Sequence, residues 1–168
     1  MKKIAALAIA VSLLGAASVH AAEAPTPPSQ RWSFDGLFGT FDRAALQRGF
    51  QVYKEVCAAC HSLNFIRYRD LGGRYGLGYN EDEIKAIAAQ YEVTDGPNDQ
   101  GEMFQRPGRP ADKFKAPFPN VKAAAAANNN AAPPDLSLMV EARKGGADYL
   151  YAVLTGYVDP PADVTVME

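Results

Sequence analysis

The sequence is poor in the residues that bind metals and form disulfides. Its 168 residues include only two cysteines, Cys57 and Cys60, and two histidines, His20 and His61. A disulfide framework of the kind that supports small secreted domains needs more cysteines, and a structural zinc site needs four ligands. Three of these four residues form the run "CAACH" at 57–61. We therefore look for the chemistry of the chain at this run.

Long apolar runs are also scarce, and the only one lies at the N-terminus. Two lysines precede an uncharged, mostly apolar run, and small residues follow it. This pattern predicts a secretory signal peptide at residues 1–21, cut after Ala21. A membrane-anchoring helix is the alternative, although the run is short for a bilayer of about 30 Å. Cleavage removes His20, so His61 becomes the only histidine of one exported domain at 22–168.

Basic residues are not in excess. Of the 17 basic side chains, two belong to the signal peptide, and the remaining 15 oppose 19 acidic ones, a formal charge of −4. This balance argues against nucleic acid as a partner and permits a basic protein partner. The chain has 14 glycines and 12 prolines, which predicts much turn and loop. Residues 22–30 have little reason to fold, and we expect a long loop over 94–120.

No segment shows the alternation of a strand, so the predicted fold class is mainly α with long loops. Asp42 is a good N-cap for a first helix. Gly49 inside that helix predicts that another helix crosses closely there. Asn80 and Glu83 have the spacing of a capping box, which places a second helix after Asn80.

Two further helices are predicted near the C-terminus. One runs from about Asp135 to the glycine pair at Gly145, and the other is capped by Asp148 and ends at Gly156. In each of the four predicted helices, four residues fall at helical spacing on one face. The faces comprise Leu46, Phe50, Tyr53 and Cys57; Ile84, Ile87, Ala88 and Tyr91; Leu136, Met139, Val140 and Arg143; and Tyr149, Leu150, Val153 and Leu154.

The spacing of Cys57, Cys60 and His61 brings three side chains toward one region within a single helical turn. Two sulfurs could bond to the edge of a flat ligand there while an imidazole reaches its centre. Haem has this form, since its iron takes a histidine nitrogen as axial ligand, and Cys-x-x-Cys-His is the signature of c-type haem attachment. The alternative is a thiol–disulfide oxidoreductase, but that site expects a strand before the motif, and here we predict a helix.

A second axial ligand is often methionine in low-spin electron carriers. Three methionines remain after signal cleavage, and each also has an ordinary structural interpretation. Met103 lies in the predicted loop and ranks first on the residues alone. Met139 lies on an apolar helix face, where methionine commonly fills space, and Met167 lies near the end of the chain, where order is often lost.

Three segments together resemble the cytochrome c1 family, the haem subunit of the bacterial cytochrome bc1 complex. They are "WSFDGLFGTFDRAALQRGFQVYKEVCAACHSL", "DGPNDQGEMFQRPG" and "AANNNAAPPDLSLMVEARKGGADYLYAVLTGYVDPP", and the similarity covers Trp32 to Pro161. The resemblance implies a class I c-type cytochrome-like helical domain with long loops wrapped on one covalent haem c. It implies an electron carrier without substrate chemistry of its own, hence not an enzyme. A stand-alone soluble c-type cytochrome is the competing interpretation.

The resemblance also implies partners and location. The intact protein would associate with cytochrome b, accept an electron from the Rieske iron–sulfur subunit and pass it to a soluble cytochrome c. This would occur on the periplasmic side of the bacterial inner membrane. In the family, an axial methionine and a C-terminal membrane anchor follow downstream of "GYVDPP". Because the sequence stops at Glu168, we expect the domain to be incomplete at its C-terminus and assign no sixth iron ligand within it.

The roles of individual residues follow from the same resemblance. Cys57 and Cys60 would form the thioether bonds to haem c, and His61 would be the proximal iron ligand. Arg143 would face a haem propionate, and a guanidinium paired with a carboxylate is a sound physical basis for that role. Four loop residues and one tyrosine would lie near the haem: Asn128, Ala131, Pro133, Pro134 and Tyr149.

Overall fold

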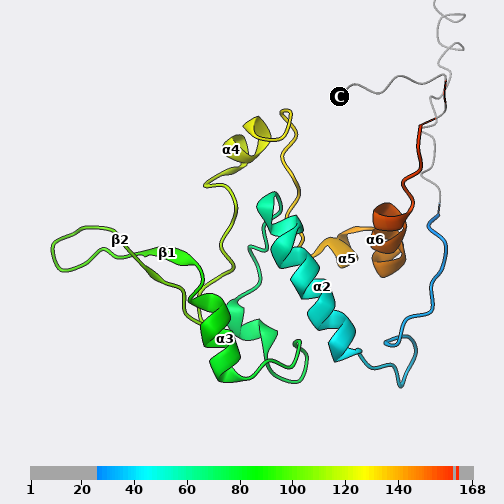
Figure 1. The fold of residues 1–168 in the computed structure, drawn as a ribbon, viewed down its shortest axis with the longest axis horizontal. Coiled ribbons are helices and arrows are strands. Elements are labelled where there is room, and N and C mark those ends of the chain that lie inside the picture. The colour runs from blue at the N-terminus through cyan, green and yellow to red at the C-terminus, as the bar shows by residue number, and fades with distance from the viewer. Residues whose placement is uncertain (1–25, 161, 163–168) are drawn as a thin grey trace, which may run out of the picture.

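The computed structural model describes residues 26–160 and 162, so the predicted signal peptide and Met167 lie outside the described residues. The elements form a mainly helical domain with long connections, as predicted, and one small sheet that was not predicted (Figure 1). Their order is α2 (Arg43–Glu55), the 3-10 turns η1 (Cys57–Ala59) and η2 (Tyr68–Leu71), α3 (Glu81–Ala88), β1 (Glu92–Asp95), β2 (Phe104–Pro107), α4 (Val121–Ala126), α5 (Met139–Ala142) and α6 (Gly146–Thr155). None of the described helices combines the length and apolar character needed to cross a membrane.

Helix α2 begins as predicted and ends earlier than predicted. The Asp42 side chain accepts a hydrogen bond from the backbone N–H of Ala45 at 3.1 Å, which makes it the N-cap. The helix stops at Glu55, so Cys57 belongs to the following 3-10 turn. The helix crossing predicted at Gly49 is wrong for the described part of the chain, because no atom of another segment there lies within 4 Å of a Cβ built on this glycine. Helix α2 instead contacts the core through other residues.

The core lies between α2, α3 and η2. Among the described residues, its buried side chains are Tyr68, Leu71, Ile84, Ala88 and Phe114, with Phe50, Tyr53, Ile87 and Tyr91 packed around them. The predicted capping box of α3 is confirmed: Asn80 accepts from the N–H of Glu83 at 2.9 Å, and Glu83 accepts from the N–H of Asn80 at 2.7 Å. Ile84 and Ala88, from the predicted apolar face of α3, are buried against Tyr68 and Leu71 of η2.

The prediction that the chain has no strand is wrong. Strands β1 and β2 pair antiparallel, with Glu92 opposite Pro107 and Asp95 opposite Phe104. They form a hairpin that projects from the body of the molecule (Figure 1). The hairpin is largely exposed, so its residues carry little of the apolar alternation that identifies a half-buried strand.

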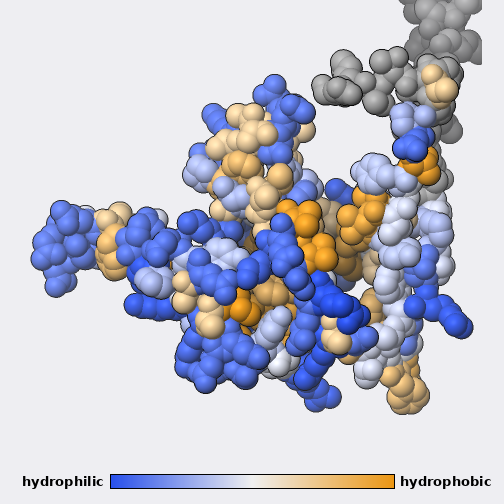
Figure 2. Space-filling view, in the orientation of Figure 1, coloured by the Kyte–Doolittle hydropathy of each residue, from blue (hydrophilic) through white to orange (hydrophobic). Residues whose placement is uncertain are grey.

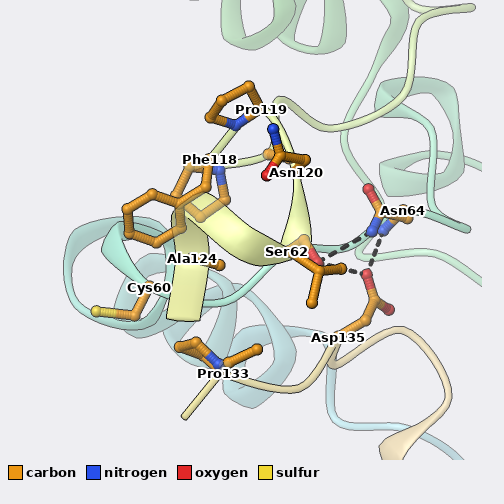
Figure 3. A pocket seen from close by; sticks show the side chains of 13 residues that line it. Cys60, Ser62, Asn64, Phe118, Pro119, Asn120, Ala124, Pro133 and Asp135 are labelled. Atoms are coloured by element: carbon orange, nitrogen blue, oxygen red, sulfur yellow. Dashed lines mark hydrogen bonds between the residues drawn. The ribbon is translucent and has the colours of Figure 1, made fainter. Parts of the chain in front are cut away.

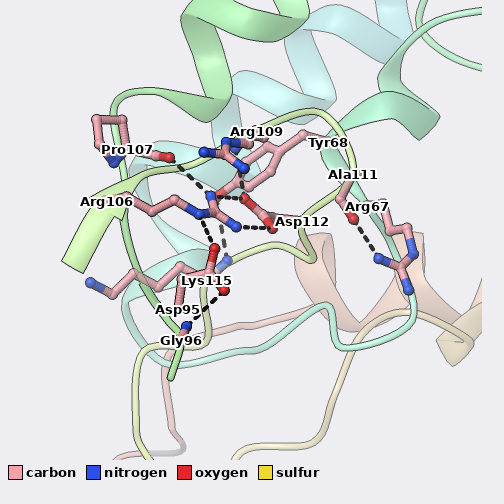
Figure 4. A network of polar contacts seen from close by, with 10 residues as sticks. All are labelled: Arg67, Tyr68, Asp95, Gly96, Arg106, Pro107, Arg109, Ala111, Asp112 and Lys115. Carbon is pink, nitrogen blue, oxygen red and sulfur yellow. Dashed lines mark hydrogen bonds and ion pairs between the residues drawn. The ribbon is translucent and has the colours of Figure 1, made fainter. Parts of the chain in front are cut away.

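Charged side chains, rather than apolar packing, tie this hairpin to the rest of the protein (Figure 4). The Arg106 guanidinium hydrogen-bonds to Asp95 on the paired strand and reaches both carboxylate oxygens of Asp112, at 2.6 and 2.9 Å. Asp112 also accepts from the backbone N–H of Arg109 at 2.7 Å. A bidentate arginine–carboxylate contact is directional, so it holds the hairpin at a defined angle to the turn that follows it.

The helices near the C-terminus begin at other residues than predicted, so α5 is shorter and α6 is longer than expected. Helix α5 begins at Met139 and not at Asp135, because the Asp135 side chain accepts hydrogen bonds from a different segment. The N-cap of α6 is Gly145, with a φ of 92°, and not Asp148. A left-handed backbone of this kind is adopted readily only by glycine. The end of α6 at Gly156 agrees with the prediction.

Asp148 has a long-range role in place of the predicted cap. It accepts hydrogen bonds from the backbone N–H of Gln30 at 3.1 Å and from the indole Nε1–H of Trp32 at 2.7 Å. The prediction that residues 22–30 have little reason to fold is therefore wrong at Gln30. The aromatic segment after it packs only in part: Trp32 meets Tyr151 edge-on at 5.8 Å, whereas Phe38 is 91% exposed.

Candidate haem site

The Cys-x-x-Cys-His run forms one tight turn at the end of α2. The Cys57 carbonyl accepts from the backbone N–H groups of both Cys60, at 3.1 Å, and His61, at 2.8 Å. Both cysteines are free thiols and are half-buried. A helix, and not a strand, leads into the turn. The local structure is therefore the one predicted for haem attachment and differs from the strand expected before a thiol–disulfide site.

The imidazole of His61 is held in one tautomer. Its Nδ1 lies 2.8 Å from the carbonyl oxygen of Pro134. A carbonyl only accepts hydrogen bonds, so Nδ1 must carry the proton. In the neutral imidazole the lone pair then lies on Nε2, an atom for which no hydrogen bond is found among the described residues. A neutral imidazole with one nitrogen donating to a carbonyl is the form in which histidine binds metals.

The backbone of His61 is also fixed. The Tyr53 hydroxyl, from α2, donates to the His61 carbonyl at 3.2 Å. Burial raises the pKa of Tyr53 to about 12, with nearby Tyr91 and Asp135 adding to the effect. The hydroxyl therefore remains a proton donor at neutral pH. The helical spacing places Tyr53 on an apolar face, and nothing in the sequence pattern indicates this polar contact.

Residues 134–137 run beside residues 61–65. The Leu136 N–H donates to the Ser62 carbonyl at 3.0 Å, and the Ser137 hydroxyl accepts from the Phe65 N–H at 3.1 Å. Between them, Asp135 accepts from the Ser62 hydroxyl at 2.7 Å. Burial alone would raise the pKa of Asp135, but hydrogen bonds from Ser137, Asn64 and Ser62 outweigh it and hold the pKa below its ordinary value.

An open pocket of about 260 Å³ lies beside the motif. Figure 3 shows Cys60, Phe118 and Pro133 toward one side of this pocket and the hydrogen-bonded group of Ser62 and Asp135 toward the other. Its full lining is Cys60, Ser62, Asn64, Ala116, Pro117, Phe118, Pro119, Asn120, Val121, Ala124, Ala132, Pro133 and Asp135. Most of these side chains are apolar, which suits a macrocycle with a hydrophobic face.

Exposed apolar side chains continue from the motif across the surface. Figure 2 shows hydrophobic residues gathered over the C-terminal end of α2 and the area between α2 and α6. Val56, next to Cys57, is 66% exposed, and Leu138, at the start of α5, is 56% exposed. This apolar surface suits a covalently attached haem, together with the two free thiols and the Nε2 atom of His61.

The other residues predicted to contact haem fall into two groups. Pro133 lines the pocket with Cys60, and Pro134 holds His61. The Asn128 amide donates to the Ala124 carbonyl at 2.7 Å, and Ala124 also lines the pocket. The Ala131 N–H donates to the Asn128 carbonyl at 2.9 Å. These residues therefore form the pocket or the loop that leads to it.

Arg143 and Tyr149 are not connected to the motif in the same way. Arg143 follows α5, is exposed, and its guanidinium donates to the Ala142 carbonyl at 3.3 Å. Tyr149 lies half-buried on α6. Within the described residues, neither makes a hydrogen bond or ion pair with 57–61, and their contacts to haem remain predictions.

The two described methionines lie in different settings. Met103 stands just before β2, in the projecting hairpin, and is 61% exposed. Met139 is the first residue of α5 and is buried. The buried position of Met139 agrees with its interpretation as a packing residue, and we assign neither methionine to iron.

Comparison with known proteins adds a family to this geometry. The model of the "Cytochrome C1 family" matches residues 32–168. The chain belongs to the cytochrome c1 family. It is 51% identical over 149 residues to "Cytochrome c1 1, heme protein, mitochondrial" of Arabidopsis thaliana, covering 89% of this chain and 47% of that protein. It is 53% identical over 135 residues to "Cytochrome c1" of Rhodospirillum rubrum, covering 80% of this chain and 48% of the relative.

A third cytochrome c1 relative has a name that joins two subunits. The chain is 47% identical over 193 residues to "Cytochrome b/c1" of Bradyrhizobium diazoefficiens, covering 99% of this chain and 28% of that protein. The chain thus spans about half the length, or less, of these curated relatives. The resemblance identified from three quoted segments is confirmed as family membership, and it carries the class I c-type cytochrome fold with it.

Proposed function

We propose that this chain carries one haem c, bound covalently through Cys57 and Cys60, and serves in electron transfer. The observation that carries the proposal is the hydrogen bond from His61 Nδ1 to the Pro134 carbonyl. It leaves Nε2 of the same side chain available to iron, one residue after a cysteine of the motif. The haem supplies a one-electron couple when bound, whereas the protein supplies attachment, ligation and surroundings.

Each residue of the site has a role in this function. The two thiols anchor the group, and His61 provides its iron ligand. The Pro134 carbonyl and the Tyr53 hydroxyl fix the imidazole and its backbone. The apolar residues of the pocket beside Cys60 would supply a hydrophobic surface for the group. We extend the proposal to Asn128, Ala131 and Pro133 as haem contacts, to Arg143 as the partner of a propionate, and to Tyr149 near the same edge. None of these groups is needed as a general acid, base or nucleophile, in agreement with an electron carrier.

At the level of the whole protein, we infer a subunit of a quinol–cytochrome c reductase complex on the periplasmic side of a bacterial inner membrane. Family membership and the name "Cytochrome b/c1" of one relative support this. Its partners would be cytochrome b and a Rieske iron–sulfur subunit as donor, with a soluble cytochrome c as acceptor. The acidic balance of the region after the predicted signal peptide favours a basic acceptor.

The decisive experiment is a pyridine haemochrome spectrum of the purified protein after denaturation. Covalent haem that survives denaturation supports the proposal. Single Cys57→Ala and Cys60→Ala variants provide matched controls, because each should leave one attachment and shift the haemochrome band. A haem-free wild-type protein with two titratable thiols would overturn the proposal and favour the thiol–disulfide oxidoreductase.

A second experiment tests whether this protein passes electrons to a basic soluble cytochrome c with the help of charge attraction. The reduced protein, mixed with a basic soluble cytochrome c, should reduce it at a rate that falls as ionic strength rises, since salt screens attraction between opposite charges. An acidic soluble cytochrome is the control and should react more slowly at low salt. A rate that is independent of salt for both acceptors contradicts electrostatic docking.

A further inference from the structure

Asp135 lies at the centre of a hydrogen-bond cluster that was not predicted from the sequence. Its Oδ2 accepts from the Ser62 hydroxyl and from the Asn64 backbone N–H, both at 2.7 Å, and its Oδ1 accepts from the Ser137 N–H at 2.8 Å. The Asn64 amide donates to the Ser62 hydroxyl at 3.0 Å. We call the side chains and backbone groups of Ser62, Asn64, Asp135 and Ser137 the Asp135 cluster.

The cluster is adjacent to the contact that fixes the iron-binding imidazole. Ser62 follows His61 directly, and Asp135 follows Pro134 directly. The two segments are 73 residues apart in the sequence. Each partner of the His61–Pro134 hydrogen bond is therefore one residue away from a member of the Asp135 cluster.

The chain before Pro134 offers little to hold its carbonyl in place. Pro133 and Pro134 have no backbone N–H, so neither can donate a hydrogen bond. Residues 129–132 are exposed. The N–H groups of Asn130 and Ala131 donate only within their own loop, to the carbonyls of Ala125 and Asn128. After the two prolines, the Leu136 N–H donates across to the Ser62 carbonyl. The position of the Pro134 carbonyl thus depends on the residues that follow it.

From this arrangement we propose that Asp135 is a positioning residue for His61. Its carboxylate holds the chain at Pro134 so that the Pro134 carbonyl stays against His61 Nδ1. The inference rests on the proposed haem function, because that function makes the His61 imidazole an iron ligand. The hydrogen bond that Nδ1–H donates orients the ring and increases the basicity of Nε2. Loosening the bond should weaken donation to iron and raise the reduction potential of the bound haem.

A negative charge near the site could also influence the potential without any positioning. The variants must therefore separate charge from geometry. Asp135→Glu keeps the charge and adds a methylene, so its carboxylate cannot accept from the same three donors. Ser62→Ala removes one donor and changes no charge. Asp112→Asn is the matched control, because it removes a partly buried, hydrogen-bonded carboxylate from the hairpin network away from this cluster.

The readouts are the midpoint potential and the hydrogen-exchange rate of the His61 Nδ1 proton, measured by NMR on the intact haem-loaded protein. In Asp135→Glu we expect exchange about tenfold faster, as for the loss of one good hydrogen bond. The midpoint should rise by about 30 mV, a threefold change in the ratio of oxidised to reduced protein for a one-electron couple. Ser62→Ala should change both in the same direction by less, and Asp112→Asn should change neither.

The inference is overturned if Asp135→Glu and Ser62→Ala both leave the exchange rate of the His61 Nδ1 proton and the midpoint potential unchanged. This holds even if Asp135→Asn, which removes the negative charge, shifts the potential. A haemochrome spectrum of each variant accompanies these measurements. Covalent haem with wild-type exchange in the variants refutes the positioning role alone, whereas a wild-type protein without covalent haem refutes the proposed function and this inference together. Where a substitution at Asp135 prevents accumulation of the protein, Ser62→Ala decides.

Discussion

At the scale of a single residue, Tyr68 is the largest fully buried side chain among the described residues. It is fully buried, and its ring stacks on Phe114 with centroids 4.5 Å apart. Tyr68→Ala should lower the free energy of unfolding by about 3–5 kcal/mol, as for other large aromatic-to-alanine changes in cores. Tyr68→Phe should cost about 1 kcal/mol, because only the contact from the Lys115 N–H is lost. Urea unfolding measures both.

The control for this prediction is Tyr75→Ala. Tyr75 is 87% exposed, and exposed substitutions usually change stability by less than about 0.5 kcal/mol. If Tyr68→Ala is no more destabilising than Tyr75→Ala, the core described around η2 is wrong.

Asp112 gives the stability a dependence on acid pH. Hydrogen bonds from Arg106 lower its pKa from the ordinary 3.8 to about 2, against the opposing effect of burial. Because the folded pKa lies below the unfolded pKa, the contribution to stability is present above about pH 4. It is lost as the pH falls toward 2. Asp112→Asn should therefore show a weaker loss of stability than the wild type between pH 4 and 2.

Urea midpoints at a series of pH values test this, with Asp82→Asn as the control. The Asp82 side chain is 94% exposed and has only a long contact to Lys85 at 3.7 Å, which is worth little in water. Equal pH slopes for Asp112→Asn and the wild type would contradict the assignment of acid sensitivity to the Arg106 network.

At the scale of an element, helix α3 depends on its capping box. Asn80→Ala removes the acceptor for the Glu83 N–H and should cost about 1 kcal/mol, the usual value for such caps. Asp82→Ala lies in the same first turn but accepts no backbone hydrogen bond at the cap, so it should cost less. Thermal unfolding followed by circular dichroism measures both. A cost for Asn80→Ala no larger than that for Asp82→Ala would show that packing alone sets the start of α3.

The elements that were predicted correctly are those whose signals are local. The caps Asp42 and Asn80 act on backbone groups three residues away, and the apolar face of α3 matches its buried side. The hairpin was missed because it is largely exposed and is joined by the contacts of Arg106, which link the two strands and a later turn. Charged contacts of this kind leave no periodic pattern in the sequence. Asp135 and Asp148 were taken as helix-start signals because aspartate is a common cap, whereas both bind distant segments.

At the scale of the whole molecule, the site combines a local motif with a long-range contact. Cys57, Cys60 and His61 were identifiable from five consecutive letters, and the family resemblance added Pro133 and Pro134. The pairing of His61 with the Pro134 carbonyl, and of Ser62 with Asp135, spans 73 residues. No spacing rule predicts such a pairing. The tautomer of His61, which is the feature most relevant to iron, therefore became evident only from the fold.

The whole domain should depend on haem for its stability. Among the described residues, the buried hydrophobic side chains are only Tyr68, Leu71, Ile84, Ala88, Phe114 and Met139. A group that binds the folded state alone stabilises it, and here it would cover apolar surface that is otherwise exposed near α2, α5 and α6. Replacing both cysteines by alanine should lower Tm by about 10 °C or more, since each kcal/mol corresponds to about 2–4 °C in a chain of this size.

The thiols themselves add little to this effect, and wild-type protein produced without the machinery that attaches haem c, and so without haem, shows how much. That protein keeps both cysteines and should melt within a few degrees of the double-alanine variant, well below the haem-loaded wild type. Melting is followed by circular dichroism at the same protein concentration and pH. A haem-free protein as stable as the loaded one would mean that the described core is sufficient, and that the exposed apolar surface around the motif does not contribute to folding through haem.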